Sequence, residues 1–235
     1  MATNNFTFKH FSINQDKSAF RVGTDGVILG AYTDIRGAKR ILDIGTGTAL
    51  IALMLAQRSN AEIVALEPDH DSCLQACENV DKSKWKSRIT VLNSTLQEYT
   101  DNRKFDLIVT NPPWFADSLK NPDPRKSYAR HNDSLPSGVL LINVSRLLAD
   151  GGRFQLIMPY VEGNLLIAEA AGYGLYCSDI LKIKPLPTSE IRRLILTFGR
   201  ERVRPAEKYL TIEYGKRHEF TEEYINLTKE FYLKF

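Results

Sequence analysis

The sequence KRILDIGTGTALIALMLAQR, residues 39–58, decides the fold class of this chain. Its first part, 39–45, has apolar residues at its centre and predicts a short buried strand. A turn with two glycines follows, and the apolar run over 49–58 predicts a helix. A strand, a glycine turn and a helix in that order bring the backbone close to a ligand, as nucleotide-binding sites require.

The rest of the chain continues this alternation of apolar strands and amphipathic helices. Asp69 is placed to cap the helix after the second strand, and Thr221 is placed to start the last helix. The helix that begins near residue 135 is expected to end at Gly151 and Gly152. The alternation predicts an α/β fold with a mostly parallel sheet. The later strands are expected at 62–68, 88–93, 105–110, 152–159, 175–184 and 191–198.

The composition excludes several classes of protein. The chain has 235 residues, of which 43% are hydrophobic and 25% charged, so disordered and fibrous proteins are excluded. The longest apolar run, 49–56, is far shorter than the roughly 20 residues of a membrane-spanning helix. The N-terminus lacks an apolar signal core, and the three cysteines form no disulfide framework. We therefore expect a cytoplasmic protein without a bound metal.

Acidic residues end the first two predicted strands. Asp43 lies where ligands bind in α/β sheets, in the crevice beyond the strand ends. Glu67 could accept hydrogen bonds from both hydroxyls of a ribose. A turn or helix-start role is the alternative for each. A dinucleotide fingerprint would place a third glycine where this chain has Leu50, so a pyrophosphate is disfavoured.

A second motif, Asn111-Pro112-Pro113-Trp114, follows the fourth predicted strand. Two prolines fix the backbone and remove two amide donors, which leaves the local carbonyls as acceptors. The Asn111 side chain supplies another acceptor, and Trp114 supplies an aromatic face. The motif predicts a site for a planar amine held between two acceptors, with its ring against an aromatic side chain.

These motifs resemble the class I S-adenosylmethionine-dependent methyltransferases that modify exocyclic or amide nitrogens. The chain is more closely similar to the family of bacterial tRNA(Val) adenine N6-methyltransferases, from about residue 6 to the C-terminus. Four segments carry that resemblance besides the glycine turn. They are FTFKHF (6–11), AFRVGTDGVILGA (19–31), PRKSYAR (124–130) after the Asn-Pro-Pro-Trp motif, and FYLKF (231–235).

The resemblance implies a Rossmann-like fold with a seven-stranded, mostly parallel sheet, an antiparallel last strand and helices on both faces. It implies a single domain over 1–235. Residues 1–38 would form an extension covering the cofactor site, 39–200 the catalytic core, and 201–235 a C-terminal extension with a terminal helix. The implied reaction is methyl transfer from S-adenosylmethionine to N6 of the adenine immediately 3′ of the anticodon of a tRNA(Val).

The resemblance also implies roles for individual residues. Gly45 and Gly47 would line the methionine end of the cofactor, and the Gly23–Gly26 turn would close over it. Two positions depart from the usual pattern: Ala49 replaces a third glycine, and Asn93-Ser94-Thr95 replaces an acid that often binds the cofactor adenine. The cofactor-binding residues are expected to be Gly23, Thr24, Asp25, Gly26, Asp43, Gly45, Gly47, Glu67, Asn93 and Thr95.

The catalytic group would consist of Asn111, Pro112 and Trp114. Hydrogen bonds from the adenine amine to the Asn111 side chain and the Pro112 carbonyl would favour a pyramidal, electron-rich nitrogen in the transition state. Trp114 would stack on a base rotated out of its helix. No general base is required by this mechanism.

The positive charge lies in the second half of the chain. The net charge is +3, and residues 182–217 contain ten basic and four acidic side chains. Such a basic segment suits a polyanion, and a solvated surface of mixed sign is the alternative. The RNA surface is expected to include Lys120, Arg125, Lys126, Arg130, His131, Arg192 and Arg193, extended by Arg200, Arg202, Arg204, Lys208, Lys216 and Arg217. The expected partner is tRNA, with no membrane, no obligate protein partner and a monomeric state.

Other functions share the Asn-Pro-Pro-aromatic motif. A guanine N2-methyltransferase acting on RNA is the strongest alternative, because the motif alone recognises an amine or an amide. Enzymes that methylate glutamine in release factors usually carry a helical domain ahead of the glycine turn, and DNA enzymes usually carry a target-recognition domain; we expect neither here. A catalytically silent RNA-binding module is the non-enzymatic alternative. An NAD-dependent oxidoreductase is disfavoured by Leu50.

Overall fold

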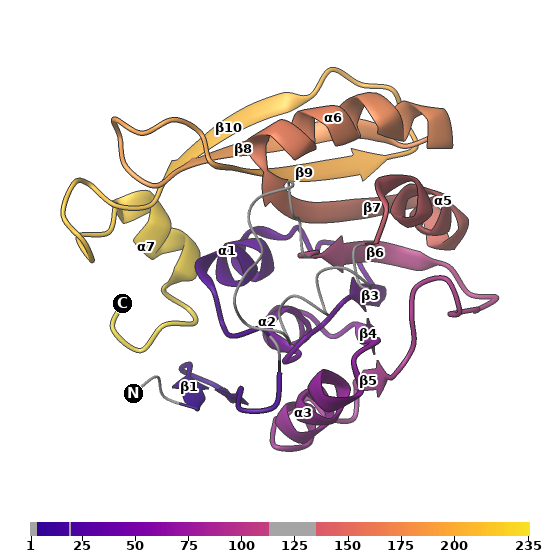
Figure 1. Cartoon of the computed structure of the whole chain (residues 1–235), viewed down its shortest axis with the longest axis horizontal. Coiled ribbons are helices and arrows are strands. Elements are labelled where there is room, and N and C mark those ends of the chain that lie inside the picture. Colours follow the sequence, from indigo (N-terminus) through magenta and orange to yellow (C-terminus); the bar gives the residue numbers. More distant parts are fainter. Residues whose placement is uncertain (1–3, 19, 113–134) are drawn as a thin grey trace, which may run out of the picture.

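A computed structural model describes residues 4–18, 20–112 and 135–235 of the chain (Figure 1). Within these residues one eight-stranded sheet has the order β10-β8-β9-β7-β6-β3-β4-β5. Its strands are β3 (Arg40–Ile44), β4 (Glu62–Leu66), β5 (Ile89–Leu92), β6 (Phe105–Thr110), β7 (Leu148–Pro159), β8 (Tyr176–Lys184), β9 (Arg193–Gly199) and β10 (Ala206–Thr211). All neighbouring strands are parallel except β9, which is antiparallel to β7 and β8.

The prediction of a Rossmann-like, mostly parallel sheet with helices on both faces is confirmed, but the predicted count of seven strands is wrong. The additional strand is β10, at the edge of the sheet. The last strand along the chain is therefore parallel to its neighbour β8, and the antiparallel strand β9 precedes it. Residues 206–209 are exposed, so β10 lacks the apolar alternation by which strands are found in a sequence.

Helices cover both faces of the sheet (Figure 1). One face carries α1 (Thr24–Tyr32), α2 (Leu50–Arg58), α3 (His70–Asp81) and α7 (Glu222–Thr228), and the other carries α5 (Ser137–Leu147) and α6 (Tyr160–Ala170). Successive strand residues point to opposite faces. In β3, Ile41 packs with the first group of helices and Leu42 with the second. The sheet thus separates two apolar cores, and its strand ends remain available for a site.

Two predicted helix starts are confirmed. The Asp69 side chain caps α3 by accepting a hydrogen bond of 2.8 Å from the amide of Ser72. The Thr221 hydroxyl accepts one of 3.2 Å from the amide of Tyr224 at the start of α7. The Gly23–Gly26 segment also begins a helix, α1.

The helix that begins near residue 135 was predicted to end at Gly151 and Gly152, and this prediction is wrong. Helix α5 ends at Leu147, and β7 begins at Leu148. Leu148 pairs with Phe105 of β6. A Cβ atom at position 152 would lie 2.9 Å from the backbone oxygen of Phe105. Gly152 therefore permits close contact between neighbouring strands and does not terminate a helix.

The two ends of the chain lie side by side (Figure 1). The N-terminal hairpin of β1 (Asn5–Thr7) and β2 (Ser12–Asn14) brings Phe8 against Tyr232, with ring centroids 5.8 Å apart. The Lys9 Nζ donates hydrogen bonds of 2.6 and 2.8 Å to the backbone oxygens of Lys229 and Phe235. The sequence segments 6–11 and 231–235 thus form one structural unit.

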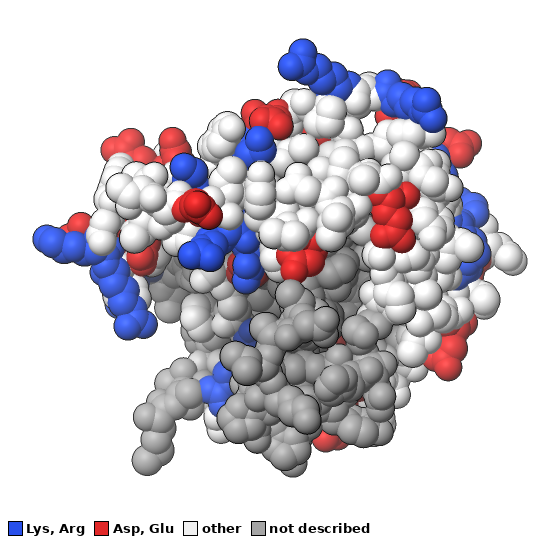
Figure 2. All heavy atoms as spheres, turned by 45° about the horizontal axis from the view of Figure 1, so that its top comes forward, with Lys and Arg blue, Asp and Glu red and all other residues white. Residues whose placement is uncertain are grey.

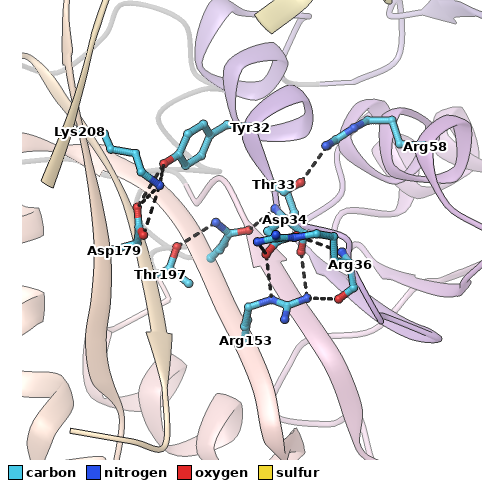
Figure 3. A network of polar contacts seen from close by, with 10 residues as sticks. Tyr32, Thr33, Asp34, Arg36, Arg58, Arg153, Asp179, Thr197 and Lys208 are labelled. Carbon is cyan, nitrogen blue, oxygen red and sulfur yellow. Dashed lines mark hydrogen bonds and ion pairs between the residues drawn. The ribbon is translucent and has the colours of Figure 1, made fainter. Parts of the chain in front are cut away.

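A polar network holds the end of α1 on the sheet (Figure 3). The Gln155 side chain of β7 accepts a hydrogen bond of 3.0 Å from the amide of Asp34 and donates one of 2.8 Å to the Thr197 hydroxyl of β9. Arg153 donates to the backbone oxygens of Asp34 and Arg36. The network fixes one end of α1, and the opposite end of that helix begins at Thr24.

Replacing Gln155 by Leu is expected to lower the free energy of unfolding by about 2 kcal/mol. Gln155 is 2% exposed, so the change leaves an amide and a hydroxyl without their partner in a site closed to water. Urea unfolding measures the loss. Gln57→Leu is the control, because the Gln57 Nε2 donates one hydrogen bond, to the Glu230 backbone oxygen, and the change leaves only that oxygen without its partner. Equal effects of the two substitutions would contradict a special role for the buried network.

Within the described ranges, no helix has the length and apolar character needed to cross a membrane.

Candidate active site

Four neighbouring parallel strands end in one row. The register pairs Ile44 of β3 with Leu66 of β4 and with Thr110 of β6, and it pairs Leu66 with Leu92 of β5. The residues that follow these four ends are Gly45, Glu67, Asn93 and Asn111. Residues far apart in the sequence therefore meet at the carboxyl edge of the sheet, where ligands bind in α/β folds.

The glycine turn after β3 has a left-handed backbone at three positions. Gly45 and Gly47 have φ of 66° and 57°, and Ala49 has φ of 63°. A side chain at such a φ costs roughly 1–2 kcal/mol. Ala49 is fully buried at the start of α2, so packing compensates for this cost. The turn therefore needs a left-handed backbone conformation at residue 49, and alanine adopts it here.

Glu67 connects the second strand to the glycine turn. Its Oε2 accepts a hydrogen bond of 2.7 Å from the amide of Gly47, and its Oε1 accepts one of 3.1 Å from the amide of Asp69. The side chain is 8% exposed. Two backbone amides thus hold the carboxylate beside the glycine turn.

Asp43 lies beneath the turn. It is fully buried, and it does not line the cavity at the strand ends. Its Oδ2 accepts a hydrogen bond of 2.6 Å from the Thr46 hydroxyl. Burial raises the pKa of Asp43 to about 6, and the hydrogen bond from Thr46 opposes that rise. Asp43 therefore supports the turn from below.

Replacing Asp43 by Asn is expected to stabilise the protein at pH 8 and not at pH 4. The folded-state pKa of about 6 lies above the usual 3.8, so the folded protein favours the protonated acid. The contribution of Asp43 to stability is therefore greatest below pH 3.8 and falls as the pH rises through 6, by on the order of 3 kcal/mol. Asn removes this term, and its amide oxygen can still accept from Thr46. Urea unfolding of both proteins without ligand, at several pH values, measures the difference in their free energies of unfolding. A difference that stayed the same at every pH would contradict the prediction.

A cavity of about 570 Å³ opens above this row of strand ends. We call it the strand-end cavity. Its volume is in the range of small-ligand and cofactor sites. The glycine turn, the loop after β4, residues 94–97, the segment before α1 and the end of β6 all line it. Of the predicted site residues, those in its lining are Gly23, Thr24, Asp25, Gly26, Gly45, Gly47, Glu67, Thr95, Asn111 and Pro112.

The start of α1 faces the end of β6 across this cavity. A Cβ atom at Gly26 would lie 3.1 Å from Leu50 Cδ2 and 3.7 Å from the Asn111 amide nitrogen, so glycine allows the helix to approach the strand end. The Thr110 hydroxyl donates a hydrogen bond of 2.8 Å to the Ile44 backbone oxygen, which joins the ends of β6 and β3. The fixed end of β6 thus positions Asn111 opposite the start of α1. Gly26 leaves the space between them free of a side chain.

Asn93 and Thr95 occupy different positions relative to the cavity. The Asn93 amide donates hydrogen bonds of 2.9 and 3.0 Å to the backbone oxygens of Glu67 and Pro68, and Asn93 does not line the cavity. Thr95 lines it, and its hydroxyl donates a hydrogen bond of 2.9 Å to Glu98. Asn93 therefore holds the Glu67 loop, while Thr95 belongs to the segment 94–97 that lines this side of the cavity.

The predicted RNA-binding residues separate into three groups. Trp114, Lys120, Arg125, Lys126, Arg130 and His131 lie outside the described residues. Arg192 and Arg193 lie beside the start of α1, where Arg193 Nε donates a hydrogen bond of 2.8 Å to Asp25. The third group makes contacts elsewhere on the protein. Arg200 donates hydrogen bonds to the backbone oxygens of Ser145 and Leu148, and Arg202 lies over the Tyr176 ring. Lys208 forms an ion pair with Asp179, and Lys216 forms one with Glu219.

Figure 2 shows Lys and Arg side chains interspersed with Asp and Glu over the face turned to the viewer. Basic side chains gather at its left edge, over the C-terminal part of the chain, and acidic ones lie among them. The visible surface has mixed sign.

Sequence reasoning missed several residues of the cavity. Phe20 and Arg21 precede the Gly23–Gly26 turn, and Phe20 is 43% exposed. An aromatic and a basic residue directly before a glycine turn were the available signal. Ser72 and Gln97 also line the cavity. Their positions follow from α3 and from the loop after β5 and have no signature in the local sequence.

The fold and the site define a class I S-adenosylmethionine-dependent methyltransferase. The family described as the methyltransferase small domain matches residues 26–127. A predicted O-methyltransferase from Agrobacterium tumefaciens superposes with a TM-score of 0.63 and 20% identity, over 88% of this chain and 96% of that one. The glycopeptide N-methyltransferase MtfA complexed with S-adenosylmethionine superposes with a TM-score of 0.58 and 10% identity, over 78% and 96%. At these sequence identities, the two similarities concern the fold alone.

The sequence narrows this class to one family. A tRNA1(Val) (adenine(37)-N6)-methyltransferase of Trichodesmium erythraeum is 42% identical over the full length of both chains. Proteins of the same name are 45% identical in Parabacteroides distasonis, again over both full lengths, and 46% identical in Bacteroides thetaiotaomicron, over 99% of each chain. This chain belongs to the tRNA1(Val) (adenine(37)-N6)-methyltransferase family.

Proposed function

We propose that this protein transfers a methyl group from S-adenosylmethionine to N6 of an adenine in tRNA, the adenine immediately 3′ of the anticodon of a tRNA(Val). The observation that carries the proposal is the convergence of Gly45, Glu67 and Asn111 on one cavity at the carboxyl edge of the sheet, in a chain of this family.

The residues around the strand-end cavity fit the cofactor. The Glu67 carboxylate lines the cavity and carries only hydrogen-bond acceptors, which suits ribose hydroxyls. The left-handed backbone of Gly45 and Gly47 lets a ligand approach without side chains in the way. When bound, S-adenosylmethionine supplies a methyl group already activated as a sulfonium. The protein therefore needs no nucleophile of its own, and its tasks are alignment and exclusion of water.

Asn111 and Pro112 act on the adenine amine. Its lone pair is shared with the ring, which makes it a weak nucleophile. Acceptors at the Asn111 side chain and the Pro112 backbone bind the two N–H groups and stabilise the nitrogen as it becomes pyramidal, an interaction that is stronger in the transition state than in the ground state. Trp114, beyond the described residues, would stack on the same base.

The remaining elements of the proposal concern the ends of the chain and its partners. Residues 1–38 cover the cofactor site as an extension of the core 39–200, and 201–235 form a C-terminal extension within a single domain of 1–235. Basic side chains bind the phosphates of the tRNA. The protein works in the cytoplasm as a monomer, without an obligate protein partner.

Nucleoside mass spectrometry tests the proposal. Bulk tRNA from a strain that lacks the gene is incubated with the purified protein and S-adenosylmethionine. We expect a gain of N6-methyladenosine in tRNA(Val) and in no other fraction. A gain of N2-methylguanosine would keep the methyl transfer and replace the base. Absence of any new methyl group in tRNA, with the cofactor still bound, would favour the RNA-binding module.

A further inference from the structure

A second cavity adjoins the strand-end cavity. Its volume is about 900 Å³, and residues of β1, of the β8–β9 connection and of the C-terminal part of the chain line it. We call it the C-terminal cavity. Thr24 and Asp25, at the start of α1, line both cavities. One turn of helix therefore separates the proposed methyl-transfer site from a second hollow.

One wall of the C-terminal cavity is aromatic. Phe220, Tyr224, Tyr232 and Phe235 line it. Phe220 stacks on Tyr224 with centroids 5.1 Å apart and contacts Phe235 edge-on at 5.2 Å. Phe220 and Tyr232 are half-buried, so part of each ring remains open. The wall offers aromatic surface within a fixed cluster of rings.

The rest of the lining carries three Lys or Arg side chains and two acidic ones. Arg192 and Lys234 are exposed, and neither forms an ion pair with any residue that the structure describes. Arg193 is engaged with Asp25 at 2.8 Å. The acid Glu213 accepts a hydrogen bond of 2.8 Å from the amide of His218. His218, whose φ of 72° is left-handed, thus lies in a loop that this hydrogen bond ties to Glu213.

The wall is a built part of the fold. Lys9 holds the backbone oxygens of Lys229 and Phe235, on both sides of Lys234. The Tyr224 and Tyr232 hydroxyls lie 3.3 Å apart in a shared hydrogen bond. The C-terminal residues 231–235 are thus fixed against the N-terminal hairpin, and the cavity between them is preformed.

A nucleotide combines the two properties that this lining recognises, a flat apolar base and an anionic phosphate. Rotating one base out of a stem-loop also removes the stacking partner of its neighbours, which then need another surface. We propose that the C-terminal cavity binds a nucleotide adjacent to the methylated adenine, its base against Phe220 and Tyr232 and its phosphate towards Arg192 and Lys234. This proposal rests on the proposed function and names a second subsite for the same RNA.

Two substitutions test the proposal, each with a matched control. Phe220→Leu removes the ring and is expected to weaken tRNA binding about tenfold. Lys234→Gln changes only an exposed side chain, so it folds as the wild type does. We expect it to weaken binding severalfold and to reduce the slope of log Kd against log salt concentration by about one. Tyr214→Leu and Lys229→Gln are the controls, because both side chains are exposed, near in sequence and outside the cavity lining.

A double-mutant cycle identifies the bound base. Single abasic positions are placed on either side of the target adenine in the tRNA anticodon stem-loop. For the wild type, one such position is expected to cost about tenfold in affinity, and for Phe220→Leu the same position should cost less than twofold. Affinity for S-adenosylmethionine should be unchanged throughout.

Failure of the second subsite and failure of the proposed function give different results. If the wild type methylates tRNA, and both variants bind it as tightly as their controls with no coupled abasic position, the second subsite is wrong and the proposed function stands. If the wild type neither binds nor methylates tRNA, both proposals fail together.

Discussion

Replacing Asn111 by Ala is expected to lower the rate of methyl transfer by about a hundredfold to a thousandfold and to leave cofactor affinity within about twofold of the wild type. Asn111 follows β6, whose end is tied to β3 by the hydrogen bond from Thr110 to Ile44. The substitution therefore removes one acceptor without moving the backbone that carries it. Because Asn111 forms no hydrogen bond with other described residues, its loss should not disturb Glu67 or the glycine turn.

Single-turnover kinetics with saturating tRNA and cofactor measure the rate, and calorimetric titration measures cofactor affinity. Asn164→Ala is the control. Its amide donates a hydrogen bond of 2.7 Å to the Tyr160 backbone oxygen on α6, and Asn164 does not line the strand-end cavity. A near-normal rate in Asn111→Ala would remove Asn111 from the catalytic group. A fall in cofactor affinity as large as the fall in rate would assign it to cofactor binding instead.

The strand-end row could be predicted because each of its members follows a strand in the local sequence. Gly45, Glu67 and Asn111 all come directly after apolar runs whose parallel arrangement is implied by the intervening helices. Such a row can be predicted from the local sequence without knowledge of contacts between distant parts of the chain. The predicted helix starts at Asp69 and Thr221 succeeded for the same reason, since a cap is an interaction over three residues.

The elements that were missed depend on distant parts of the chain. The apolar pattern of α5 runs on past Leu147, and only pairing with Phe105 converts Leu148 and its successors into a strand. The exposed residues of β10 give no strand pattern, and backbone pairing with β8 places them in the sheet. Asn93 is next to the cavity in sequence, yet its amide is used to hold the Glu67 loop.

Replacing Glu67 is expected to raise the Kd for S-adenosylmethionine about a hundredfold. Under the proposed function the carboxylate would accept hydrogen bonds from the cofactor ribose, and it also holds the turn by accepting from the Gly47 amide. Glu67→Ala removes both functions. Glu67→Gln keeps the shape of the side chain but replaces one acceptor oxygen with an NH₂ donor. The two oxygens now face the amides of Gly47 and Asp69, so in Gln one donor would meet another donor.

We therefore expect Glu67→Gln to bind the cofactor nearly as weakly as Glu67→Ala, although it is the conservative change. Calorimetric titration compares the variants, and thermal unfolding without ligand shows whether the turn itself is destabilised. Glu62→Gln is the matched control, because Glu62 begins the same strand, β4, and forms an exposed ion pair of 3.2 Å with Arg103 at the opposite edge of the sheet. If Glu67→Gln bound the cofactor like the wild type, the shape of the side chain would suffice, and the charge and acceptor pattern of Glu67 would have no part in binding.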